Sequence, residues 1–157
     1  MITATLVPDA ALPRLAAMPA ALRERLAQTV ARLAQELRNT VQRKLSGEVL
    51  RRRSGRLAAS VAVDVRESGG GVAASLSTDV EYAAIHEYGG VIPARQVLPR
   101  NARVLAFPWK GRQRFFARVE IPAVTMPQRS FLRSSLDEMT PEIRAALTDA
   151  VRDAVRR

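Results

Sequence analysis

Hydrophobic residues recur every three or four positions between about Pro19 and Leu45, which predicts one long helix with a single apolar face. The apolar positions are Leu22, Leu26, Val30, Leu33, Leu37, Val41 and Leu45. Pro19 suits a first helical turn, and Gly47 suits the helix end. A coiled coil is the competing interpretation, and the many alanines between the strong hydrophobes disfavour it. A single apolar stripe needs a sheet or a second helix to cover it.

Shorter segments alternate hydrophobic and polar residues with period two, which is typical of strands buried on one side. Segments 61–65 and 72–77 alternate in this way on either side of a glycine-rich turn, so they predict an antiparallel hairpin. A second hairpin is predicted from 104–107 and 115–121, with its turn at 110–113 and Trp109 at its tip.

The remaining segments predict two more helices. Tyr82 and Ile85 have helical spacing within 81–88, and Gly89 with Gly90 would end that short helix. Pro122 and Pro127 keep the following segment extended and out of a central strand.

The C-terminal helix is predicted to begin at 140–142, where threonine, proline and glutamate provide a cap, a first-turn residue and a favourable charge. Its apolar stripe would be Ile143, Leu147, Val151 and Val155 or Ala154. The element order indicates an α+β fold of one domain, residues 1–157, in which a long N-terminal helix and a C-terminal helix pack on a small antiparallel sheet of hairpins.

Composition limits the possible classes of protein. Only 4% of the 157 residues are aromatic, so the core is built mainly from leucine, valine and isoleucine, and a modest core favours an oligomer. The chain has no cysteine, which excludes disulfides, thiolate nucleophiles and the common structural zinc sites. The start lacks the pattern of a secretory signal, and no apolar run reaches the roughly 20 residues needed to span a bilayer. We therefore expect a protein made in the cytoplasm without a membrane segment.

The chain carries a formal charge of +10, from 25 basic and 15 acidic residues. Such an excess attracts polyanions, and DNA phosphates could be contacted without sequence specificity. Two clusters of basic residues stand out, at 51–56 and at 110–114. A solvated loop is the alternative interpretation of each, and no motif of a sequence-specific DNA reader accompanies them.

Catalytic chemistry finds little support in the sequence. His86 is the only histidine and has no visible metal or nucleophile partner, although His86 and Glu87 could form half of an acid–base pair. Asp64, Asp79 and Glu81 do not have the spacing of a metal loop, and no phosphate-binding glycine loop is present. The chain is predicted to be no enzyme and to bind no cofactor or metal.

Three segments together resemble the tail-completion, or head–tail joining, family of long-tailed double-stranded DNA phages. They are 54–60 (SGRLAAS) after the long helix, 81–89 (EYAAIHEYG), and 126–136 (MPQRSFLRSSL) before the terminal helix. The last commonly reads Pro-Ala-Arg-Pro-Phe-Leu in the family, and here Gln128 and Ser130 depart from it.

The resemblance implies a structural subunit of the virion, assembled in the host cytoplasm into a ring, commonly a hexamer, at the joint between head and tail. Its partners would be the portal-side connector and the tail-tube or tail-terminator proteins, with double-stranded DNA passing through the centre. Candidates for lining the DNA channel are Arg51, Arg52, Arg53 and Arg56. Candidates for the subunit interface are Tyr82, Glu87, Arg129, Phe131 and Leu132.

Several interpretations of these residues stay open. Arg129 and Glu87 could form a charge pair, and Phe131 and Leu132 could dock into the sheet or into an adjacent subunit, with packing inside the chain as the alternative for all four. Other functions in view are a tail terminator ring that caps the tail tube, a basic DNA-binding accessory protein without sequence specificity, and a small hydrolase that uses His86.

Overall fold

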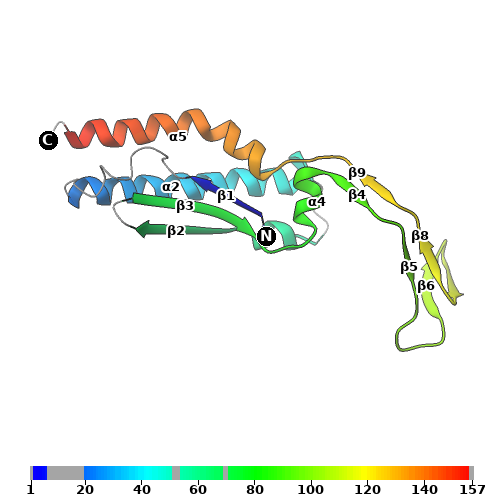
Figure 1. Ribbon diagram of the computed structural model, residues 1–157. Helices are drawn as coiled ribbons and strands as arrows, with labels where there is room; N and C mark the ends of the chain where they lie inside the picture. The colour runs from blue at the N-terminus through cyan, green and yellow to red at the C-terminus, as the bar shows by residue number, and fades with distance from the viewer. Residues whose placement is uncertain (1, 7–19, 51–53, 69–70, 156–157) are drawn as a thin grey trace.

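The computed structural model describes residues 2–6, 20–50, 54–68 and 71–155, which form a three-layer body and a projecting β arm (Figure 1). The middle layer is α2 (Ala20–Arg43), and α5 (Leu132–Val155) lies antiparallel beside it. On its other side lies a three-stranded antiparallel sheet of β1 (Ile2–Leu6), β2 (Ala62–Ser68) and β3 (Gly71–Thr78), in the order β1-β3-β2. The predicted α+β class is confirmed, with the refinement that α5 packs mainly on α2.

The apolar stripe of α2 forms the centre of the core, as the sequence pattern predicts. Its buried leucines and valine are Leu22, Leu26, Leu33, Leu37 and Val41, whereas Val30 is only half-buried. The chain continues through a π-helical turn, η1 (Lys44–Glu48), in which Leu45 is buried and Gly47 adopts a φ of 143°. That backbone conformation favours glycine, so Gly47 ends the helix where expected. The short helix α3 (Arg56–Ser60) leads into β2.

The first predicted hairpin is confirmed, since β2 and β3 pair antiparallel with Val63 opposite Leu76. Strand β1 was not predicted, and it pairs with β3 so that Ile2 lies opposite Thr78. A signal for it existed, because Ile2, Ala4 and Leu6 alternate with Thr3 and Thr5 in the period-two pattern of a strand.

The start of the C-terminal helix was predicted wrongly. Helix α5 begins at Leu132, and Pro141 lies inside it. The Thr140 Oγ1 donates a hydrogen bond to the carbonyl of Leu136 at 2.7 Å, one turn back, so it caps no helix start.

The buried face of α5 also differs from the predicted stripe. Met139, Ile143 and Ala150 are buried and Leu147 is half-buried, as is expected of a helix face that packs on α2. Val151 is exposed, which corrects the predicted stripe, and the side chains of Ala154 and Val155 lie outside the described part of the chain.

The second hairpin is part of a longer arm. Strand β6 (Leu105–Trp109) pairs with β7 (Arg112–Phe116) around a turn at Lys110 and Gly111, both with positive φ, and Trp109 lies beside that turn. Residues 119–121, expected in the same hairpin, form β8 (Val119–Ile121) and pair with β5 (Arg95–Val97). Strand β9 (Val124–Met126) pairs with β4 (Gly90–Ile92).

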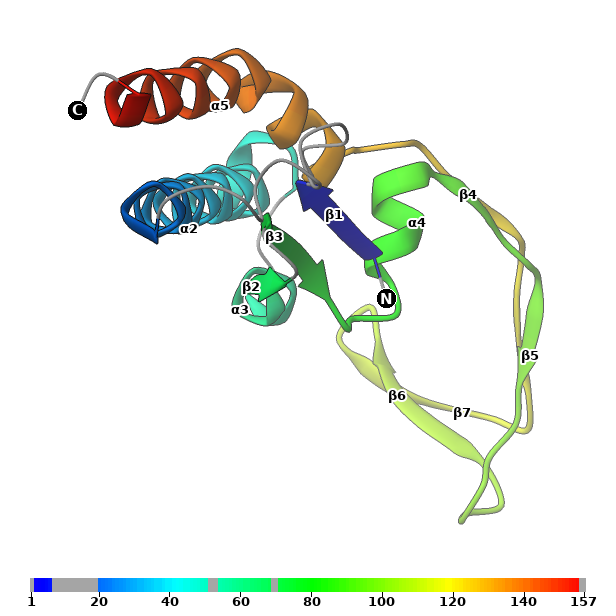
Figure 2. The same cartoon turned by 60° about the vertical axis from the view of Figure 1, so that its left-hand side comes forward.

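Three successive antiparallel ribbons therefore make up residues 90–126, called the arm below, which projects from the body and curves (Figures 1 and 2). Pro93 on one limb and Pro122 on the other fall between the first and second ribbons. Proline has no N–H to donate to a ladder, so the two prolines interrupt the pairing at the same place.

Candidate functional site: the arm and its base

The arm exposes hydrophobic side chains that a protein normally buries. Of the twelve large exposed hydrophobic residues in the described part of the chain, eight lie in the arm, and none of the buried core residues does. They are Val91, Ile92, Leu98, Val104, Trp109, Phe115, Phe116 and Val124. Concentrated apolar exposure of this kind marks an interaction surface.

The arm is also strongly basic. It contains seven basic residues and the single acidic residue Glu120, so it carries +6 of the chain's net +10. The basic residues are Arg95, Arg100, Arg103, Lys110, Arg112, Arg114 and Arg118.

The outermost ribbon combines both properties on one face. Residues opposite each other in an antiparallel pair point to the same side, and the register places Phe107 opposite Arg114 and Trp109 opposite Arg112. The Phe107 and Phe116 rings stack with centroids 5.2 Å apart. Aromatic and arginine side chains are enriched in protein interfaces, so this face is suited to contact an apolar, acidic protein surface.

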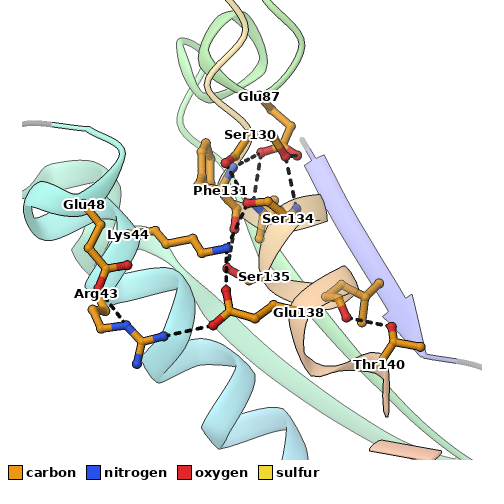
Figure 3. A network of polar contacts seen from close by, with 12 residues as sticks. Arg43, Lys44, Glu48, Glu87, Ser130, Phe131, Ser134, Ser135, Glu138 and Thr140 are labelled. Atoms are coloured by element: carbon orange, nitrogen blue, oxygen red, sulfur yellow. Dashed lines mark hydrogen bonds and ion pairs between the residues drawn. The ribbon is translucent and has the colours of Figure 1, made fainter. Parts of the chain in front are cut away.

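Glu87 joins the two ends of the arm. It lies in α4 (Ala83–Tyr88), just before the arm, and its carboxylate is almost fully buried. Its Oε1 accepts hydrogen bonds from Ser130 Oγ at 2.7 Å and from the Arg133 amide at 2.9 Å (Figure 3). Its Oε2 accepts from the amides of Phe131 at 2.8 Å and Leu132 at 3.0 Å. We call Glu87, Ser130 and these three amides the cap network.

The cap network explains why α5 begins at Leu132. The first amides of a helix have no partner inside the helix, and a carboxylate there is favoured by the helix dipole. Burial raises the pKa of Glu87, but the hydrogen bonds from Ser130 Oγ and from the amides of Leu132, Arg133 and Phe131 outweigh it, so the net pKa is lowered. Glu87 is therefore an ionised cap for a helix that begins more than forty residues later in the sequence.

Backbone contacts hold the two limbs of the arm together at the same point. The amide of Arg129 donates to the carbonyl of His86 at 2.7 Å. Gly89 has a φ of 70° and a ψ of −172°, and a Cβ there would lie 2.8 Å from the amide nitrogen of Gln128. Only glycine allows this approach, so the arm leaves the body at a fixed point.

A second set of polar contacts connects the start of α5 to the end of α2. The Lys44 ammonium, largely buried, donates to Ser134 Oγ at 3.1 Å and lies 2.9 Å from Glu138 Oε2 (Figure 3). Arg43 bridges Glu138 and Glu48. The hydrogen bond and charge of Lys44, followed by the charge of Arg43, lower the pKa of Glu138. The base of the arm is thereby linked to the central helix.

Three of the five candidate interface residues lie inside the chain. Glu87 is in the cap network, and Phe131 and Leu132 are buried in the core together with residues of α2 and β3. Their side chains pack within the chain, the alternative left open above, so they offer no surface to a neighbour. The apolar residues after Met126 dock into the body because the cap network fixes the first turn of α5.

Arg129 and Tyr82 are exposed, and the suggested charge pair between Arg129 and Glu87 is not among the ion pairs of the described residues. The oxygens of Glu87 are bonded to Ser130 and to backbone amides, and no ion pair joins Glu87 to Arg129 in the described part of the chain. Tyr82, 41% exposed, packs edge-on against the His86 ring.

The predicted channel residues are described only in part. Arg56 is exposed at the start of α3, and Arg51, Arg52 and Arg53 lie outside the described residues. Burial and the charge of Arg129 lower the pKa of His86, and its Nδ1 has no hydrogen-bond partner among described residues. Within the same ranges, no cluster of His, Asp and Glu could hold a metal ion, and no helix is long and apolar enough to cross a membrane.

The arm as a unit, and the cap network, were missed from the sequence. A signal existed, because two of the segments behind the family resemblance, 81–89 and 126–136, prove to be the two sides of the arm base. Their spacing in the sequence reflects the arm between them.

Comparisons with known proteins agree with the phage resemblance at a coarser level. The model of the phage virion morphogenesis family matches residues 9–156, nearly the whole chain. Comparison with curated proteins found no match, and comparison with solved structures found none. On the extent of the family match, the chain belongs to the phage virion morphogenesis family.

Proposed function

We propose that this protein is a ring-forming head–tail connector or tail-completion subunit, which joins the phage head and tail around the DNA channel. Family membership supports a role in virion assembly. The observation that carries the finer proposal is the arm, a basic and apolar ribbon fixed at its base and without a partner among the described residues of its own body.

The arm needs another surface to be fully stable. An isolated two-stranded ribbon is marginally stable in water, and this one leaves Trp109 and Phe115 more than half exposed. Contacts with neighbouring subunits or adjoining rings would bury those side chains. An assembly protein with one compact body and one reaching element fits this requirement, because the body can hold its place in a ring while the arm contacts the next component.

The charge of the chain fits a ring around DNA. A net +10 attracts the phosphate backbone without reading sequence, which suits a channel through which any genome sequence must pass. In this proposal Arg56, with Arg51, Arg52 and Arg53, faces the lumen of a ring that we expect to be a hexamer. The portal-side connector and the tail tube or its terminator would be the partners above and below.

Particles assembled without this protein test the proposal. We expect filled heads and separate tails of normal length when they are imaged by negative stain. Overlong tails would instead indicate a tail terminator, and intact infectious particles would contradict both roles. Duplex DNA binding by the free subunit, tight and strongly salt-dependent, would favour the accessory DNA-binding protein.

A further inference from the structure

One short stretch of the body has the opposite charge to the arm. Residues 71–89 contain three acidic residues and no lysine or arginine. Glu87 is used in the cap network, which leaves Asp79 and Glu81 exposed between β3 and α4, next to the exposed Tyr82. Neither carboxylate forms an ion pair with another described residue. We call Asp79, Glu81 and Tyr82 the acidic shoulder.

The surface around the acidic shoulder is hollowed. Asp79 borders an open groove that is also lined by the small residues Ala59, Ala62 and Ser77 and, at the start of α3, by the exposed Arg56. Small side chains leave room there for a larger one from outside. The shoulder therefore places two carboxylates and an aromatic ring at the edge of a shallow recess that Arg56 borders from α3.

The tip of the arm is the complement of this surface. Lys110, Arg112 and Arg114 provide positive charge, and Trp109, which lies opposite Arg112 on the same face of the ribbon, provides an exposed aromatic ring. Building on the ring proposed above, we infer that the arm tip of one copy docks on the acidic shoulder of the next copy of this chain.

The geometry of the chain favours a neighbour over the same chain. The arm extends away from the body, and its strands pair only with one another in the described residues (Figure 1). The shorter limb, 112–126, has 15 residues, which sets an upper limit of roughly 50 Å on its reach, against about 36 Å for the whole of α2. An arm of that length can reach an adjacent copy even though it curves.

The two surfaces also have the arrangement that a ring requires. Tip and shoulder are different patches on one chain, so a contact between them is heterologous, and repeated heterologous contacts form a ring when the rotation between successive copies closes. The arm holds seven lysines and arginines and one acidic residue, whereas 71–89 holds three acidic residues and no lysine or arginine, so charge complementarity distinguishes this pairing from arm against arm.

Charge reversal tests the contact in solution. We expect the tip variant Arg112→Glu/Arg114→Glu and the shoulder variant Asp79→Lys/Glu81→Lys each to form rings at least about tenfold less readily than wild type, because like charges would face each other. A mixture of the two variants should assemble again, since each acidic tip then meets a basic shoulder and each basic tip an acidic one. Native mass spectrometry reads both results.

A matched control carries the same change of charge elsewhere. Arg23 and Arg144 are exposed on α2 and α5 and form no ion pair in the described chain, so Arg23→Glu/Arg144→Glu should assemble like wild type. Circular dichroism and thermal melting confirm that all variants are folded. Wild-type assembly by the tip variant, or failure of the mixture to assemble, would overturn the contact.

Crosslinking extends the test to assembled particles. The chain has no cysteine, so a variant with Glu81→Cys and Arg112→Cys can be bridged by a short bifunctional thiol reagent. We expect a ladder of covalent oligomers that ends at the ring size, and only monomers from either single variant. Rings that give no ladder would overturn the docking contact but not the proposed ring. Crosslinks to a different virion protein would have the same meaning. Absence of rings in solution and in particles would overturn both.

Discussion

The body and the arm of this protein use hydrophobic residues in opposite ways. In the body, Leu33, Val41, Leu76 and Phe131 are almost completely buried and hold α2, the sheet and the start of α5 together. In the arm, residues of the same types are exposed, and no core residue is found. The comparison shows that one chain contains a region that specifies its own fold and a region whose apolar surface needs a partner.

Two phenylalanines give the largest expected contrast between the regions. Phe131 is fully buried and Phe115 is 63% exposed. We expect Phe131→Ala to lower the free energy of unfolding by about 3–5 kcal/mol, because it removes a large side chain from the core and leaves a cavity. Phe115→Ala should change it by less than about 0.5 kcal/mol. Urea unfolding followed by circular dichroism measures both, and equal losses would contradict the division into two regions.

Glu87 lies where the two regions meet, and its replacement should have the next largest effect. Glu87→Gln keeps the size of the side chain but places an amide group against four hydrogen-bond donors. We expect a loss of about 2–4 kcal/mol in the free energy of unfolding, because charge-assisted bonds to buried amides are lost. Glu81→Gln, an exposed change of the same chemistry nearby, serves as the control. If Glu87→Gln were as stable as Glu81→Gln, the fold of α5 would not depend on the charge of Glu87.

The same contrast explains which features the sequence could predict. The stripe of α2 and the β2–β3 hairpin depend on local periodicity, and both are present as predicted. The beginning of α5 depends on a carboxylate from a distant residue, so the local signal at Thr140 and Pro141 was misleading. Proline was taken as a first-turn residue, yet it lies in the helix interior.

The arm and its base show a further limit of sequence reasoning. The β6–β7 hairpin has a recognisable turn, but the pairing of β5 with β8 and of β4 with β9 involves three-residue strands separated by prolines. Strands that short carry no period of their own. Phe131 and Leu132 were selected as important residues, but the sequence alone left open whether they pack within the chain or against a neighbour.

Gly89 tests how rigidly the arm is fixed to the body. Its backbone conformation is open essentially to glycine alone, and a Cβ would press against the Gln128 amide. We expect Gly89→Ala to cost about 1–3 kcal/mol and to speed hydrogen exchange at the amides of 128–133. Gly111→Ala in the turn at the arm tip is the control, since nothing lies within 4 Å of the Cβ it would add. Unchanged exchange at the base would argue against a fixed exit point.

Acid should loosen the base of the arm by removing the charge of Glu87. The folded pKa of Glu87 lies below its unfolded value of about 4.3, so its contribution to stability is present above that value and is lost as the pH falls through the folded pKa. We therefore expect the difference in unfolding midpoint between wild type and Glu87→Gln to narrow steadily below about pH 4. A difference that stayed constant from pH 6 to pH 3 would contradict an ionised cap.

Removal of the arm should have the smallest effect on the body, and it separates the two regions most directly. Ile92 lies opposite Val124 in the ladder, so replacing 93–123 by Asn-Gly would close β4 and β9 with a two-residue turn. We expect a thermal midpoint within a few degrees of wild type, because the excised segment contributes no core residue. The slope of the urea transition should also fall only slightly, since little of the buried surface is removed.

Assembly should then separate the two chains. Unassembled, the full-length protein and the shortened chain should melt at nearly the same temperature. If only the full-length protein gains stability on assembly, the arm's apolar surface acts between molecules. A shortened chain that unfolds would instead mean that the arm supports its own body.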